Sequence, residues 1–294
     1  MTSTNKAHIA VLTANLFFAA NYSLVKSISP SLIKPYGLNV IRVAVSLTLF
    51  WLIWLFNRKA QKPGIKKEHI GRFFWCGLMG VAINQMLFIK GLTMTSTIHA
   101  SLLMLSTPIL IAFFAFLILK EKFTILKGTG LALGIGGAIF LITAKGDSGE
   151  KDGYLWGDLL VILNAISYAI YFIIVKPLMK EYNPVHVVRW VFTFGLIMIL
   201  PFGWMQFSEI QWHQFSNFDF AALGFIVICG TFLAYLFNIL GIQNLGAGIT
   251  GSYIYTQPAF TAIIAVFFLN EVLTMQKIVA GILIFAGVFL VNRS

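Results

Sequence analysis

The chain has 294 residues, of which 59% are hydrophobic and 11% charged, and its mean hydropathy is +0.86. A water-soluble domain does not bury that much apolar surface, so the composition excludes a soluble globular protein and indicates a lipid bilayer around most of the chain. The net charge of +11 does not indicate a nucleic-acid partner. Many of the cations cluster in one connection between apolar segments, residues 58–72, as they do in cytoplasmic loops of membrane proteins.

Apolar segments of roughly 20 residues follow one another along the chain, and each is long enough to cross a bilayer as a helix. The stretch 9–20 is expected to be a retained helix and not a cleaved signal, because its repeat counterpart lies deep inside the chain. The fold class is therefore predicted to be all-α, a polytopic membrane protein with ten transmembrane helices. The predicted spans are 8–26, 37–56, 72–91, 97–118, 126–143, 155–175, 186–203, 220–241, 248–268 and 277–292.

The chain contains an internal repeat with an offset of 150 residues. Residues 91–137 recur as 241–287, so that Pro108 matches Pro258 and Gly137 matches Gly287. Each copy holds five helices, an odd number, so the second copy enters the membrane from the opposite side to the first. Such inverted repeats are typical of alternating-access transporters. The predicted units are a first repeat over 1–144, a polar linker over 145–154 and a second repeat over 155–294.

The cations fall mainly on the side of the membrane that holds both chain ends. This asymmetry predicts that the N- and C-termini are cytoplasmic.

Polar side chains recur at helical spacing within the predicted spans. Tyr168 and Tyr171 lie three residues apart, and Tyr253 and Gln257 lie four apart, so each pair shares one helical face. Polar groups at mid-membrane depth avoid lipid; they either line a wet central cavity or form hydrogen bonds between helices. The cavity interpretation predicts these substrate-binding residues: Asn21, Gln85, Thr107, Asn164, Tyr168, Tyr171, Tyr235, Asn238, Tyr253 and Gln257.

Two prolines and two glutamates occupy matching places in the repeats. Pro108 and Pro258 are predicted to interrupt helices at mid-membrane and to act in gating, although a packing kink with no ligand role is an equal alternative. Glu121 and Glu271 follow the same helices and are expected to cap the next helix or to pair with a lysine six residues on.

Charged groups are sparse inside the predicted spans. All ten carboxylates fall in loops or at helix ends, so no buried carboxylate relay is expected, and His99 is expected to lack a carboxylate partner. His99 leaves protons as a candidate coupling ion, but a structural histidine is the simpler interpretation. Arg42 and Arg189 are expected to extend to the nearer membrane surface, with a role in holding a substrate carboxylate as the alternative.

The predicted cavity offers amides, hydroxyls and aromatic rings without a cluster of cations, which favours a neutral or zwitterionic organic solute as the small-molecule substrate. An intramembrane enzyme would need a nucleophile with a base or a metal cluster, and no such spacing occurs. We therefore expect neither catalysis nor a metal or other cofactor. A receptor or scaffold without transport is a third class, and the oligomeric state stays open.

Several segments together resemble one family. The first span contains FAANYSLVK, and later segments contain GLTMTS, the LKEKFT turn and LGAGITGSYIYTQPAFTAIIAVFFLNEVLT. With these motifs the chain resembles the EamA-type carriers of the drug/metabolite transporter superfamily, although Phe18 and Ala19 depart from that family's tryptophan and glycine. The resemblance implies a multi-pass carrier of the cell inner membrane that exports amino acids or similar metabolites. A nucleotide-sugar or sugar-phosphate exchanger of the same superfamily is the alternative.

Overall fold

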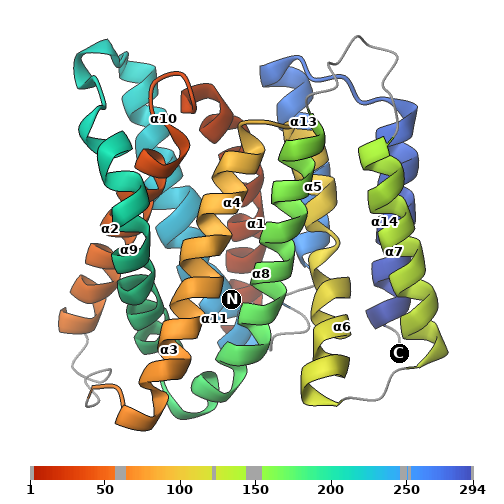
Figure 1. Ribbon diagram of the computed structural model, residues 1–294, viewed down its shortest axis with the longest axis horizontal. Helices are drawn as coiled ribbons and strands as arrows, with labels where there is room; N and C mark the ends of the chain where they lie inside the picture. Colours follow the sequence, from red (N-terminus) through yellow and green to blue (C-terminus); the bar gives the residue numbers. More distant parts are fainter. Residues whose placement is uncertain are drawn as a thin grey trace.

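The computed structural model describes residues 3–56, 64–120, 124–143, 154–245, 250 and 253–292. These residues form a bundle of helices that run roughly along one common direction (Figure 1). In a bilayer every backbone N–H and C=O must be satisfied inside the segment, which is why uninterrupted apolar sequence becomes helix. Most of the predicted linker 145–154, together with Glu121, lies outside the described residues.

The helices confirm the predicted all-α membrane fold. Eight helical segments in the described part of the chain are long and apolar enough to cross a membrane, and two shorter apolar helices follow them. The first half contains α1 (Ser3–Ile28), α2 (Pro35–Phe56), α3 (Ile70–Gly77), α4 (Ile83–Leu92), α5 (Thr97–Met104), α6 (Thr107–Leu119) and α7 (Ile125–Thr143). The second half contains α8 (Tyr154–Glu181), α9 (Pro184–Ser208), α10 (Asn217–Val227), α11 (Ala234–Leu245), α13 (Gln257–Leu269) and α14 (Met275–Asn292).

The two halves interlock rather than lying apart. The helix α1 packs against α11 and α13 of the second half, while α8 packs against α4 and α6 of the first half. Corresponding helices also pair directly: α2 packs on α9 at one end of the bundle, and α7 packs on α14 at the other (Figure 1). The long helix α8 is thus held mainly by the half to which it does not belong.

A wide π-helical turn interrupts the same helix of each half. These segments are η3 (Leu78–Ala82), between α3 and α4, and η5 (Ile228–Leu233), between α10 and α11. Each has a glycine against which the other half packs closely, and π-bulges of this kind are frequent at functional sites. A Cβ on Gly80 would lie 2.4 Å from the Tyr171 ring, and a Cβ on Gly230 would lie 2.5 Å from Asn21 Oδ1.

Both prolines stand at helix starts, next to an interruption of the span, and neither kinks a continuous helix. The fourth span breaks at Leu105–Ser106, between α5 and α6, and Pro108 lies in the first turn of α6. The ninth span has a short 3-10 segment, η6 (Tyr253–Thr256), and Pro258 lies in the first turn of α13. In the first turn the missing proline N–H has no intrahelical acceptor, so no hydrogen bond is lost there.

Glycines bring α7 and α14 into backbone contact. A Cβ on Gly130 would lie 2.5 Å from the carbonyl oxygen of Gly287, and a Cβ on Gly287 would lie 2.5 Å from the carbonyl oxygen of Gly130. Small residues at such crossings are the usual basis of tight helix packing in membranes, because van der Waals contact replaces the hydrophobic effect there.

We expect Gly130→Leu to lower the stability of the folded protein by about 1–3 kcal/mol, because backbone atoms cannot yield to the new side chain. The measurement is thermal unfolding of the purified protein in detergent. Gly136→Leu on the same helix is the matched control, since a Cβ there meets nothing within 4 Å. Equal melting temperatures for the two variants would contradict the close crossing.

Candidate functional site

One hydrogen bond joins a residue to its own repeat counterpart at the centre of the bundle. Gln85 Nε2 on α4 donates to the Tyr235 hydroxyl on α11 over 3.0 Å, and the two positions are 150 residues apart. Counterparts can touch only near the axis that relates the two halves, and in inverted repeats this axis lies in the membrane plane. Gln85 and Tyr235 therefore lie near this axis.

The surroundings of this pair are polar and aromatic. The Asn39 side chain of α2 donates to the Gln85 carbonyl oxygen over 3.0 Å. The rings of Phe18 and Phe192 contact the Tyr235 ring edge-on, with centroids 6.2 and 5.2 Å away. The pair is thus fixed by groups from α1, α2 and α9.

Arg42 lies inside the protein, so the expectation that it extends to the membrane surface is wrong. Its side chain is 3% exposed, and its Nε donates to Thr231 Oγ1 on η5 over 3.1 Å. The Thr231 hydroxyl in turn donates to the Ile226 carbonyl oxygen, which leaves its oxygen free to accept from the arginine. A bond across the two halves keeps this cation at the centre.

Arg189 matches Arg42 at an offset of 147, because the repeat slips by three residues in this region. It is also buried, but aromatic rings surround it. Its guanidinium carbon lies 4.0 Å from the Trp54 ring centroid and 4.3 Å from that of Trp51. Its Nη2 is 3.0 Å from His186 Nδ1, which must be the acceptor because a guanidinium only donates. Cation–π contact gives this charge a partner within the protein. The expectation that Arg189 extends to the membrane surface is therefore wrong as well.

Two further predicted residues join α1 to the ninth span. Gln257 Nε2 donates to Asn15 Oδ1 over 2.7 Å, and the Tyr253 hydroxyl lies 2.8 Å from His8 Nδ1. Asn15 was not among the predicted site residues, because its repeat counterpart is Ala165 and no repeated polar pattern marks it.

The remaining predicted residues lie on α1, α6, α8 and α11. Asn164 and Asn84 donate to each other's carbonyl oxygens over 2.7 and 3.4 Å, which joins α8 to α4. The rings of Tyr168 and Tyr171 stack with centroids 5.9 Å apart. Thr107 is buried at the start of α6, and Asn238 is half-buried on α11. Several of the predicted residues thus form interhelical hydrogen bonds in this conformation.

A second polar cluster joins the end of α1 to the starts of α5 and α8 and to the segment that follows α13. We call it the Lys26 network. Lys26 Nζ donates to the Thr95 carbonyl oxygen over 2.7 Å and lies 3.6 Å from Glu271. The Asp158 carboxylate accepts from the Thr95 hydroxyl and from His99 Nδ1, the latter over 3.1 Å. The network consists of Lys26, Thr95, Thr97, His99, Asp158 and Glu271.

This network corrects two expectations. Asp158 is 1% exposed and pairs with His99, so a carboxylate is buried and His99 does have a carboxylate partner. Glu271 caps α5 of the other half rather than the next helix: its carboxylate accepts from Thr97 N at 2.8 Å, Thr97 Oγ1 at 2.7 Å and Ile98 N at 3.2 Å. Sequence spacing gave no sign of either contact, because each joins segments far apart in the chain.

Hydrogen bonding keeps Glu271 ionised. Burial raises the pKa of its carboxyl, but the bonds from Thr97 and Ile98 and the charge of Lys26 outweigh burial, so the pKa lies below its usual value.

Among the residues that the structure describes, no group of three or more His, Cys, Asp or Glu side chains is placed to hold a metal ion.

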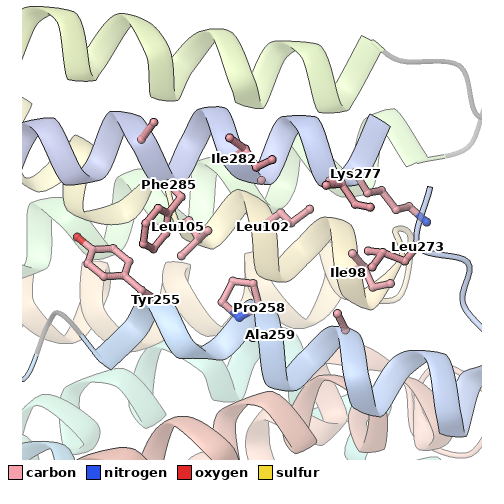
Figure 2. A pocket seen from close by; sticks show the side chains of 14 residues that line it. Ile98, Leu102, Leu105, Tyr255, Pro258, Ala259, Leu273, Lys277, Ile282 and Phe285 are labelled. Atoms are coloured by element: carbon pink, nitrogen blue, oxygen red, sulfur yellow. The ribbon is translucent and has the colours of Figure 1, made fainter. Parts of the chain in front are cut away.

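An apolar cavity of about 410 Å³ lies between α5, α13 and α14 (Figure 2). Leu105, at the break in the fourth span, and Pro258, just after the break in the ninth, both border it. Its walls are hydrophobic apart from Lys277 and the Tyr255 hydroxyl, and Ile282 beside it is 62% exposed. This apolar cavity therefore lies close to the exposed surface of the bundle and differs from the polar site predicted from sequence.

Comparison with known proteins identifies the family. The model of the EamA-like transporter family matches the chain twice, over residues 5–143 and 155–293. The chain belongs to the EamA-like transporter family. This confirms the resemblance to carriers of the drug/metabolite transporter superfamily, and the protein is a multi-pass membrane transporter.

Relatives of similar length extend over nearly the whole chain. A protein named "Uncharacterized transporter" from Archaeoglobus fulgidus is 25% identical, with 97% of each chain covered. The "Uncharacterized transporter YyaM" of Bacillus subtilis is 22% identical over 96% of this chain and 92% of its own. "Protein WALLS ARE THIN 1" of Arabidopsis thaliana is 24% identical over 97% and 82%.

A solved crystal structure has the same fold. It superposes with a TM-score of 0.62 at 17% identity and covers 97% of this chain and 96% of its own. At that identity the likeness bears on the arrangement of the helices alone.

We expect Glu271→Gln to destabilise the folded transporter by about 1.5–3 kcal/mol, because three donors lose an ionised acceptor. The wild-type protein should lose this contribution as the pH falls through the lowered pKa of Glu271, whereas the glutamine variant should show no such acid-dependent loss. Thermal unfolding across pH measures both effects.

Glu209→Gln is the control for this prediction. Glu209 pairs with Lys34 at the surface, where its side chain is 41% exposed, so its loss should cost less than about 1 kcal/mol. If the two glutamine variants melt at the same temperature, the cap on α5 contributes nothing measurable.

Proposed function

We propose that this transporter exports amino acids or similar small neutral or zwitterionic metabolites by alternating access. The observation that carries the proposal is the hydrogen bond between Gln85 and Tyr235, which brings amide and phenol groups of the two halves together. In an inverted repeat, groups near the axis that relates the halves lie at mid-membrane. An inverted pair of units can exchange conformations, so that a central site opens to one side and then to the other. We further propose that the structural repeats are residues 1–144 and 155–294, joined by the linker 145–154.

The polar groups at the centre favour this substrate class over phosphorylated sugars. A sugar phosphate or nucleotide sugar carries multiple negative charges and calls for several central cations. Beside Gln85 and Tyr235, Arg42 supplies one cation, while amides and aromatic rings supply the rest of the surface. In this proposal the protein is not an enzyme, and protons are the candidate coupling ion.

The contacts between the halves also support alternating access. The bond from Arg42 to Thr231, the bond from Gln257 to Asn15 and the whole Lys26 network join one half to the other. Polar bonds of this kind exchange for bonds to water when a pathway opens, so the cost of separation is modest. In this proposal the Lys26 network closes one end of the pathway in the present conformation.

We expect cells that overproduce the transporter to grow in the presence of toxic amino-acid analogues that stop cells carrying the empty vector. Loaded proteoliposomes should then release the corresponding radiolabelled amino acid. Pro258→Ala should retain its fold but lose most of this activity, because restoring the N–H favours a continuous helix where the ninth span now breaks.

Pro201→Ala is the matched control, since Pro201 lies within α9 and is exposed. Its activity should stay close to that of the wild type. Resistance to none of the analogues would contradict amino-acid export, and full activity of Pro258→Ala would remove the helix break from the mechanism.

We propose that the protein lies in the cell inner membrane with both termini in the cytoplasm. Single cysteines at positions 26 and 176, which are repeat counterparts at opposite ends of the bundle, should react with a membrane-impermeant maleimide from the outside and the inside, respectively. Labelling of both from one side in intact cells would mean that the halves are parallel, and alternating access by inverted repeats would fail.

A further inference from the structure

Arg42 is a buried cation with an unused donor. Its side chain is 3% exposed, and its Nη1 has no hydrogen-bond partner among the residues that the structure describes. Within the same residues no carboxylate lies within ion-pair distance of it. Arginine stays charged in proteins, and burying a charge without an opposite partner is unfavourable. A ligand that supplies negative charge would remove this imbalance.

Arg189 shows how the protein treats a buried arginine that needs no ligand. Two of its nitrogens, Nε and Nη1, also lack hydrogen bonds, but the faces of Trp51 and Trp54 cover its guanidinium. The described cation–π contacts all belong to Arg189, and none involves Arg42. The two counterparts thus differ in one respect: among the described residues, neither a carboxylate nor an aromatic face is paired with the Arg42 guanidinium.

Two unused acceptors lie on α1 and α2, the helices that pack against η5. Asn21 Oδ1 packs against Gly230, the residue before the Thr231 that holds Arg42, and it has no hydrogen-bond partner. Asn39 lies one helical turn before Arg42 on the same face of α2, and its Oδ1 is also without a partner. Both side chains are buried, at 2% and 0% exposure. Oxygen acceptors without donors are the complement of an ammonium group.

We propose that these groups form the binding site for the charged ends of an α-amino acid. Arg42 Nη1 donates to the substrate carboxylate, and the amide oxygens of Asn21 and Asn39 accept from its ammonium group. This inference rests on the proposed transport function and narrows its substrate to zwitterions that carry both groups. A bare phosphate would satisfy the arginine but not the amide oxygens, and a sugar would leave the charge of the arginine without a counter-charge.

The position of the site agrees with a carrier. Arg42 belongs to α2 of the first half and is held by η5 of the second, while Asn21 belongs to α1 and packs on η5. The unused atoms are sealed from solvent in this conformation, so a ligand reaches them only when η5 separates from α1 and α2. In this proposal the π-helical turn of η5 is the place where the helix changes conformation during that movement.

The test uses purified wild-type protein in detergent and measures the rise in melting temperature with each proteinogenic L-amino acid, its carboxamide and its des-amino acid. We expect at least one amino acid to stabilise the protein, and its two truncated analogues to bind roughly tenfold or more weakly, since each lacks one charge-assisted interaction. Equal stabilisation by an amino acid and its carboxamide would overturn the assignment of Arg42.

Variants then locate the two contacts. Arg42→Gln should bind the amino acid and its carboxamide equally weakly, and Arg42→Lys should retain part of the preference for the amino acid. Asn21→Leu should weaken the binding of the amino acid more than the binding of its des-amino analogue. Arg189→Gln is the control and should keep the wild-type preference, measured against its own ligand-free melting temperature. The comparison of ligands on the wild type holds even if Arg42→Gln does not fold.

The outcomes separate this inference from the proposed function. Transport of a solute in proteoliposomes without any response to amino acids would overturn the zwitterion site and leave a transporter of other substrates. If Arg42→Gln keeps the wild-type preference for the amino acid over its carboxamide, that result would likewise overturn the zwitterion site. Failure to transport any amino acid or analogue, with no binding, would overturn both.

Discussion

The constraint on which this structure depends is that polar groups inside a bilayer must find partners within the protein. Here the partners come from the opposite half of the chain. Gln85 meets Tyr235, Arg42 meets Thr231, and Glu271 caps a helix whose residues lie 173 or 174 positions away. The halves are therefore held together by polar contacts between them. In the proposed function, a substrate and water would use the same atoms when the pathway opens.

Two kinds of helix irregularity position these atoms. In the third and eighth spans a π-helical turn with a glycine lets the opposite half approach, so that Tyr171 packs on Gly80 and Asn21 on Gly230. In the fourth and ninth spans the helix stops and restarts just before a proline. Each irregularity occurs in both halves at the same place in the repeat. The repeated sequence thus produces helix irregularities at matching positions in both halves.

The symmetry of the backbone does not extend to the side chains. Arg42 and Arg189 are counterparts, yet one binds a threonine hydroxyl and keeps a free donor while the other is enclosed by indole rings. The Lys26 network likewise depends on Asp158, whose counterpart in the first half is His8. A carrier needs the same backbone to present two faces in turn, but it binds one asymmetric molecule. Asymmetric side chains on a symmetric frame meet both demands.

Hydropathy and repetition along the chain were enough to predict the ten helices and the offset between the repeats, because a bilayer converts these local properties directly into structure. Helical spacing also predicted interior positions for Gln85, Tyr235 and Gln257. The partners of these side chains, however, come from the packing of the helices. The burial of Arg42 and the pairing of His99 with Asp158 depend on helices that are distant in the chain, and spacing along one helix carries no information about which other helix packs against it.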